Sequence, residues 1–229
     1  MNLDVLFEDP HIIVCIKPSG IASQPDPSND TDMTHVIHQY LKESPRDYET
    51  LDVIHRLDRP VQGVMVYSKT KHATKRLSEQ IRQHNFYKEY IAVTNGVPDQ
   101  SSGTLTHYLK RIPSINYSKV VKENHKNGKK AVLEYSVTNQ IQHSTEGLLG
   151  LWQIKLITGR HHQIRVQLSQ EGYPLWGDTK YNPRYRKKTK WHQIALFASG
   201  LNFTHPVSKE NLSFTYYPKD QYPFNLFNV

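Results

Sequence analysis

Short apolar runs separated by polar turns characterise the first part of the chain. Residues 5–7 and 12–16 are apolar and are divided by two acidic residues and a proline, as in two strands joined by a turn. Ser, Pro, Asp and Asn dominate residues 21–31, which favours a surface loop. Asp32 then precedes apolar residues with helical spacing, where an N-cap would stand. The pattern predicts a β-hairpin, a loop and a short helix.

The segment 53–68 reads as a strand, a polar loop with the sequence HRLDRPVQG, and a second strand. Thr70 can cap a following helix, because apolar residues recur at every fourth position after it and basic residues fill the outward side. A further strand is expected over residues 90–93. The apolar stripe of the expected helix is Ala73, Leu77 and Ile81.

Strand periodicity returns in the second half of the chain. Residues 131–137 and 152–156 alternate between apolar and polar positions, and a helix is expected after them, with Gly172 at its end. The tail 194–217 carries further β-type runs, which we expect to break at Gly200 and at a His-Pro pair. Neither a repeat nor a linker interrupts the chain. The expected fold is of the α+β class, a single domain over residues 1–229 with a mixed, mainly antiparallel sheet, flanking helices and a central catalytic cleft.

The charge of the chain favours a polyanionic partner. The formal net charge is +8, with 37% hydrophobic and 22% charged residues, which is a globular rather than a disordered composition. Residues 110–130 carry seven lysines and arginines against one glutamate, and residues 184–190 form a second basic run without an acid. Both runs suit contact with phosphates, although a solvated charged loop without a partner is the alternative.

Cys15 is the only cysteine, which excludes an internal disulfide and fits a reducing compartment. We expect it to be a small buried apolar residue. The N-terminus carries acidic residues where a signal peptide carries positive charge, and its apolar runs are too short to span a membrane. The expected location is therefore the cytoplasm, without membrane attachment.

The loop between the strands of the segment 53–68 offers the first candidate for chemistry. Asp58 follows Arg56 and Leu57 in a polar loop, the setting in which a scaffold presents functional side chains. An aspartate there can be a nucleophile, or a turn residue that accepts backbone hydrogen bonds. The three letters RLD alone favour the turn residue.

Several longer motifs occur together in one order along the chain. HRLDRPVQGVMVYSK resembles the signature loop of RluA-type pseudouridine synthases, and the sequence KEY with the following IAV resembles the KxY strand of that family. ITGRHHQIRVQLSQEGYPLWGDTKY is similar to the family's TGRxHQIR and GDxxY motif. VLFEDPHIIVCIKPSG and FTHPVSKE resemble its opening and closing segments. The departures from the family pattern are Val61, Gln62, Gln167 and Asn182, which leave its catalytic positions intact.

The resemblance implies a set of functional residues. Asp58 would be the nucleophile, and Arg165 would grip its carboxylate and keep it ionised in a closed pocket. Tyr90 would offer a ring on which an extruded uracil stacks and a hydroxyl for proton transfer. Whether the ribose or the base is attacked stays open. Substrate contacts are expected from Arg56, Arg160, His162 and Gln163.

The resemblance implies an isomerase that needs no cofactor and acts on a uridine flipped out of structured RNA, either ribosomal or transfer RNA. We expect a monomer without an obligate protein partner. A metal site built from His55, His161, His162 or Asp178 is not expected, because no metal-binding spacing is present. The alternatives are a non-catalytic RNA-binding module of the same fold and a metal-dependent nuclease.

Overall fold

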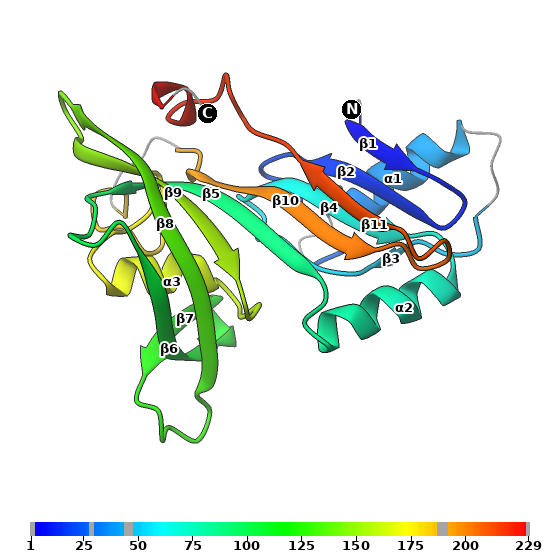
Figure 1. The fold of residues 1–229 in the computed structure, drawn as a ribbon, viewed down its shortest axis with the longest axis horizontal. Coiled ribbons are helices and arrows are strands. Elements are labelled where there is room, and N and C mark those ends of the chain that lie inside the picture. The colour runs from blue at the N-terminus through cyan, green and yellow to red at the C-terminus, as the bar shows by residue number, and fades with distance from the viewer. Residues whose placement is uncertain (1–2, 28–29, 44–47, 187–191, 228–229) are drawn as a thin grey trace. The chain divides into compact units, whose positions relative to one another are not determined.

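The structure is a computed structural model that describes residues 3–27, 30–43, 48–186 and 192–227. It divides into two compact units. The N-terminal unit comprises Met1–Lys88 and Ala198–Tyr216, and the C-terminal unit comprises Glu89–Phe197 and Tyr217–Val229. Each unit holds its own antiparallel strands and at least one helix (Figure 1). Organisation as a single catalytic domain over residues 1–229 stays a prediction.

The N-terminal unit is built on an antiparallel sheet whose central strands are buried. Its strands follow the order β1-β2-β4-β10, with β3 beside β4 and β11 beside β10. The pairs β1–β2, β2–β4, β3–β4 and β10–β11 are antiparallel. All residues of β2 are buried, which explains its continuous apolar run. The strands are β1 (Val5–Glu8), β2 (Ile12–Lys17), β3 (Asp52–Val53), β4 (Gln62–Ser68), β10 (Leu196–Thr204) and β11 (Asn211–Thr215). The first two residues of β10 belong to the C-terminal unit.

Two capped helices complete this unit, α1 (Met33–Lys42) and α2 (Lys71–Arg82). The Asp32 carboxylate accepts hydrogen bonds from the first-turn amides of α1, and the Thr70 hydroxyl accepts one from Ala73 N–H of α2. Helix α1 buries Val36, Ile37 and Leu41, and α2 buries Ala73 and Leu77, whereas Ile81 of its predicted stripe is half-buried. The two predicted N-caps are confirmed.

The C-terminal unit contains a sheet with the strand order β5-β9-β8-β6-β7, in which each neighbouring pair is antiparallel. The long strand β8 pairs with β9 on one side and with β6 on the other, so that it forms the middle of the unit. The strands are β5 (Tyr87–Asn95), β6 (Ser102–Ile112), β7 (Tyr117–Val121), β8 (Lys129–His143) and β9 (Gly147–Leu156). The first two residues of β5 belong to the N-terminal unit.

Helix α3 (Gln163–Gln170) packs against β6 and β7. Val166 of this helix, Leu109 of β6, Ala131 of β8 and Tyr181 form a buried cluster. Gly172 follows the helix at φ +89°, a left-handed conformation that glycine adopts without strain. The cluster fixes the rotation of α3 on the sheet, and with it the direction of the polar side chains that the helix carries.

The α+β class and the mainly antiparallel sheet are confirmed. The expected break at Gly200 is wrong, because Gly200 lies inside β10 and pairs with Thr215. Burial raises the pKa of the Cys15 thiol to about 12, in keeping with the predicted apolar role of this residue. None of the helices in the described ranges combines the length and the apolar character needed to cross a membrane.

At Gly63 the backbone of β4 lies close to that of β10. It has φ +136°, and a Cβ added there would lie 2.3 Å from the carbonyl oxygen of Ala198. We therefore expect Gly63→Ala to destabilise the protein by at least about 2 kcal/mol, because it adds a backbone clash to an unfavourable dihedral angle. Thermal unfolding followed by circular dichroism measures this loss.

Gly20→Ala is the matched control within the same unit. Gly20 also has a positive φ, of +84°, but an added Cβ would meet nothing within 4 Å. The control should cost only about 1 kcal/mol, the dihedral contribution alone. Equal unfolding temperatures for the two variants would show that the close approach at Gly63 does not constrain the fold.

Candidate active site

The loop that carries Asp58 is fastened to the protein on both sides of that residue. The Ser23 hydroxyl accepts a hydrogen bond from Leu57 N–H at 3.1 Å and donates one to the Leu57 carbonyl at 2.9 Å. Arg59 follows, and its carbonyl accepts a hydrogen bond from Gly20 N–H at 2.9 Å. Asp58 is half-buried, and its own carbonyl accepts from Val61 N–H at 2.9 Å. The backbone around the carboxylate therefore has little freedom.

Lys17 is the buried centre of this arrangement. Its ammonium donates hydrogen bonds to the carbonyls of Pro18, Ile21 and Arg59 at 2.9, 2.7 and 3.1 Å, and the residue is completely buried. Burial lowers the pKa of Lys17 to about 7, whereas the charge of Asp58 acts in the opposite direction. The lysine of the KPSG segment thus ties that segment to the Asp58 loop.

His55 and Arg56 precede the aspartate and have different surroundings. His55 is buried against Phe86, with ring centroids 5.5 Å apart, and its Nε2 accepts a hydrogen bond from Val66 N–H at 3.3 Å. Arg56 is exposed. The first side chain anchors the loop, while the second is available at the surface for a phosphate or a base.

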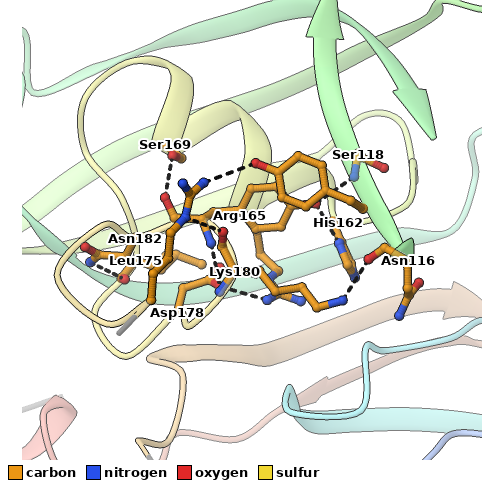
Figure 2. Close-up of polar contacts among 12 residues, drawn as sticks. Asn116, Ser118, His162, Arg165, Ser169, Leu175, Asp178, Lys180 and Asn182 are labelled. Carbon is orange, nitrogen blue, oxygen red and sulfur yellow. Dashed lines mark hydrogen bonds and ion pairs between the residues drawn. The ribbon is translucent and has the colours of Figure 1, made fainter. Parts of the chain in front are cut away.

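Arg165 forms a buried ion pair with Asp178 in the C-terminal unit. The guanidinium donates two parallel hydrogen bonds to the carboxylate, Nε to Oδ2 and Nη2 to Oδ1, both of 2.8 Å. Figure 2 shows the two side chains facing each other. Asp178 Oδ1 also accepts from the backbone N–H groups of Lys180 and Tyr181. Because both partners are almost fully buried, the pair fixes the Arg165 side chain firmly.

A chain of hydrogen bonds extends from this pair to the start of β7. The Tyr181 ring lies 5.2 Å from the Arg165 guanidinium carbon, and its hydroxyl is 2.7 Å from His162 Nδ1. The same hydroxyl accepts a hydrogen bond from Ser118 N–H at 2.8 Å. Burial, aided by the positive charge of Arg165, lowers the pKa of His162 to about 2, so this imidazole is neutral.

Gln163 and Arg160 organise the turn that leads into α3. Gln163 Oε1 accepts hydrogen bonds from the Thr158 hydroxyl and from Arg160 N–H, at 2.8 and 2.9 Å. Its Nε2 donates to the Val132 carbonyl at 3.0 Å. Arg160 is exposed, and its Nε donates to the Lys130 carbonyl at 2.9 Å. The buried glutamine therefore shapes the turn, and the arginine lies on the surface beside it.

Tyr90 lies on β5 opposite Ile154 of β9 and is 6% exposed. The structure thus places the predicted site residues in two groups. His55, Arg56 and Asp58 belong to the N-terminal unit, and the others belong to the C-terminal unit. There the structure brings Arg165 and His162 together through Tyr181. The pairing of Arg165 with Asp58 stays a prediction.

Three residues of the site were missed as functional residues in the sequence. Lys17 binds the loop that carries Asp58, Asp178 holds Arg165, and Tyr181 joins Arg165 to His162. Each belongs to a motif that was identified, KPxG or GDxxY. The motif letters marked these positions, but no local pattern indicates which distant group each side chain contacts.

Comparisons with known proteins identify the family. The family model described as RNA pseudouridylate synthase matches residues 11–170, well over half of the chain. The dual-specificity RNA pseudouridine synthase RluA of Escherichia coli (strain K12) is 33% identical over 217 residues, which are 93% of this chain and 91% of that protein. The class is therefore that of the RNA pseudouridine synthases, which are isomerases. The chain belongs to the RNA pseudouridylate synthase family, and its relatives include RluA-type enzymes.

Other relatives are longer. An uncharacterized RNA pseudouridine synthase of Mycoplasma pneumoniae is 29% identical over 93% of this chain, but the match spans 65% of that protein. Among solved structures, human RNA pseudouridylate synthase domain containing 4 is 25% identical with a TM-score of 0.72, and it covers 93% of this chain and 88% of its own. The structure of human RNA pseudouridylate synthase domain containing 1 is 18% identical to this chain, with a TM-score of 0.78. The match covers 97% of this chain and 86% of the human chain, and it supports the fold alone.

Burial of His55 gives the protein a defined sensitivity to acid. Burial lowers the pKa of His55 from 6.5 to about 3. The unfolded chain therefore takes up a proton near pH 6.5 and the folded protein does not, so the stability present above pH 6.5 is lost as the pH falls toward 3. At pH 5 the loss from this residue is about 2 kcal/mol.

We expect His55→Gln to reduce the difference between the unfolding free energies at pH 7 and pH 5 by about 2 kcal/mol. Urea unfolding curves at both pH values measure this difference. The comparison holds even if the variant is less stable at pH 7, because only the dependence on pH is used. If the variant and the unmodified protein lose the same unfolding free energy between pH 7 and pH 5, His55 is not buried in its neutral form.

Proposed function

We propose that this protein converts uridine into pseudouridine in structured RNA and that Asp58 is its nucleophile. The observation that carries the proposal is the fixed loop around Asp58, because the hydrogen bonds of Lys17 and Ser23 hold the residues that flank the carboxylate. Such fastening is what a catalytic side chain requires, since a displacement of about 1 Å can cost about a hundredfold in rate. Family membership supports the same assignment.

The proposed reaction is an isomerisation that balances without a cofactor. The bond between N1 of uracil and C1′ of ribose breaks, the base turns, and a bond between C5 and C1′ forms. C5 loses its proton and N1 gains one, so nothing is oxidised or reduced. A carboxylate can form the covalent intermediate that holds one fragment while the base turns. The proposal leaves open whether Asp58 attacks the ribose or the base.

Arg165 is the proposed counter-ion of Asp58. A carboxylate enclosed with its substrate loses water and tends to take up a proton, so a fixed cation beside it is needed. The buried ion pair with Asp178 keeps the Arg165 guanidinium in one orientation. A guanidinium held in one orientation is the kind of fixed cation that this role requires.

Tyr90 is the proposed platform for the uracil ring. Its position on a paired strand makes the ring rigid, and a rigid aromatic face stacks on a base that has left the helix. The target uridine must be flipped out of its stack for any side chain to reach its ribose. The proposed contacts to the nucleotide and its neighbours are Arg56, Arg160, His162 and Gln163.

Charge and the names of relatives support an RNA substrate. Exposed lysines at 119, 122, 126, 129 and 130 lie on or between β7 and β8. Lys187, Lys188 and Lys190 of the second basic run lie outside the described residues. One relative is named a dual-specificity enzyme and another a ribosomal large subunit synthase. We propose ribosomal or transfer RNA as substrate, and a monomer that acts in the cytoplasm without a cofactor.

We expect Asp58→Asn to abolish pseudouridine formation and to leave RNA affinity within about threefold, because the amide keeps the shape but is not a nucleophile. Carbodiimide mapping of unmodified ribosomal and transfer RNA transcripts after incubation detects the product. Filter binding to the same transcripts measures affinity.

Asp99→Asn is the matched control, because Asp99 is exposed on the connection between β5 and β6 and plays no part in the proposed site. The control should convert uridine at the rate of the unmodified protein. Full turnover by Asp58→Asn would refute the assignment of the nucleophile. Binding of RNA without conversion by the unmodified protein would instead favour a non-catalytic RNA-binding module.

A further inference from the structure

One apolar side chain stands out on the surface of the C-terminal unit. Ile115 is 63% exposed, and no other large apolar side chain in the described ranges is as exposed. It ends the short 3-10 turn Pro113–Ile115 between β6 and β7. Asn116 follows in the left-handed conformation, at φ +46°, which closes the turn. The sequence motifs do not include this turn.

The turn is held in place by the segments that lead into the Arg165 site. His161 Nε2 lies 2.9 Å from Asn116 Oδ1, and its Nδ1 lies 2.8 Å from the Ser118 hydroxyl. Lys180 donates a hydrogen bond to the Asn116 carbonyl at 2.8 Å, a contact drawn in Figure 2. His161 thus bridges both sides of Tyr117. A surface turn with so many contacts is rigid, and so the position of Ile115 is defined.

Cations surround this end of the hairpin. Arg111 and Lys119 are exposed, and β6 and β7 pair at Arg111–Ser118 and Lys110–Lys119. Arg186 donates a hydrogen bond to the Tyr117 hydroxyl at 3.5 Å. An exposed isoleucine within a cationic surface matches a partner that presents anionic groups beside apolar faces. Nucleic acid has this arrangement, because phosphates flank the bases.

We propose that Ile115 packs against a base of the substrate RNA and that His161 is the residue that positions it. The inference rests on the proposed RNA substrate and adds a contact outside the motifs of the family. The cations of the hairpin hold phosphates, and Ile115 supplies an apolar contact between them. The same histidine precedes the helix that carries Arg165, so the turn is joined to the segment that leads into the proposed active site.

The two kinds of contact differ in their dependence on salt. A lysine or arginine bound to phosphate displaces counterions. Its removal therefore reduces the magnitude of the slope of log association constant against log salt concentration by about 1. An apolar contact displaces no counterions, so its removal leaves this slope unchanged. Ile115→Ser should therefore weaken binding about tenfold and leave the salt slope unchanged. Lys119→Ala should weaken binding and flatten the slope.

Affinity is measured by filter binding to an unmodified transfer RNA transcript and an unmodified large-subunit ribosomal RNA transcript, over a salt series. His161→Ala should weaken binding about threefold, again without a change of slope. When combined with Ile115→Ser, His161→Ala should cause no further loss of affinity, because His161 acts by positioning Ile115. A merely structural histidine would cause the same loss in both backgrounds.

Leu148→Ser is the matched control, because Leu148 is 36% exposed and pairs with Gln142 at the far end of the β8–β9 ladder from Lys129. Affinity equal to that of the unmodified protein is expected. If Ile115→Ser binds like the control while the unmodified protein binds and converts RNA, the inference fails and the proposed function stands. If the unmodified protein binds neither transcript, both fail, and a protein partner becomes the occupant of this surface.

Discussion

The buried ion pair between Arg165 and Asp178 is the interaction on which the candidate site depends. Removing both charges from water is costly, and the cost is offset only when the geometry is good and the remaining polar groups are satisfied. Here two parallel hydrogen bonds join the partners, and two backbone N–H groups complete the shell of Asp178. Loss of either partner would leave an uncompensated buried charge. The segment that carries Asp178 and Tyr181 therefore has one stable position relative to α3.

Lys17 has the corresponding role in the N-terminal unit. Its buried ammonium binds carbonyls of the KPSG segment and of the loop that carries Asp58. In both units a buried basic side chain holds the chain at the candidate site, Lys17 at the loop that carries Asp58 and Arg165 at the segment that carries Asp178. The arrangement explains why motifs far apart in the sequence occur together, since the KPSG segment and the HRLD loop form one hydrogen-bonded structure. Catalytic groups held in this way need no reorganisation when the substrate binds.

Much of the fold follows from the sequence, because local patterns dictate it. Alternation predicted β8 and β9, and the capping residues Asp32 and Thr70 mark the starts of their helices. Gly200 was misjudged because a glycine weakens a strand without having to end it, and the pairing with Thr215 continues the strand through this position.

The candidate site was predictable only in part. The motifs predict Asp58, Tyr90 and Arg165 as site residues, since a motif records which residue types recur at which spacing. Arg165 pairs with Asp178, and Lys17 binds the Arg59 carbonyl. Both contacts join residues that are distant in the sequence, so no local sequence pattern predicts them. The left-handed His162 and the rigid turn at Ile115 are further examples, because ordinary residues adopt these conformations only when tertiary contacts hold them.

Release of tritium from RNA labelled at C5 of uridine tests the central claim most directly. Formation of the bond between C5 and C1′ must remove the hydrogen of C5, whereas binding or strand cleavage leaves it in place. The account predicts that the unmodified protein, without an added cofactor, releases tritium to water in proportion to the pseudouridine formed. Stable binding of the labelled RNA with full retention of tritium would contradict it.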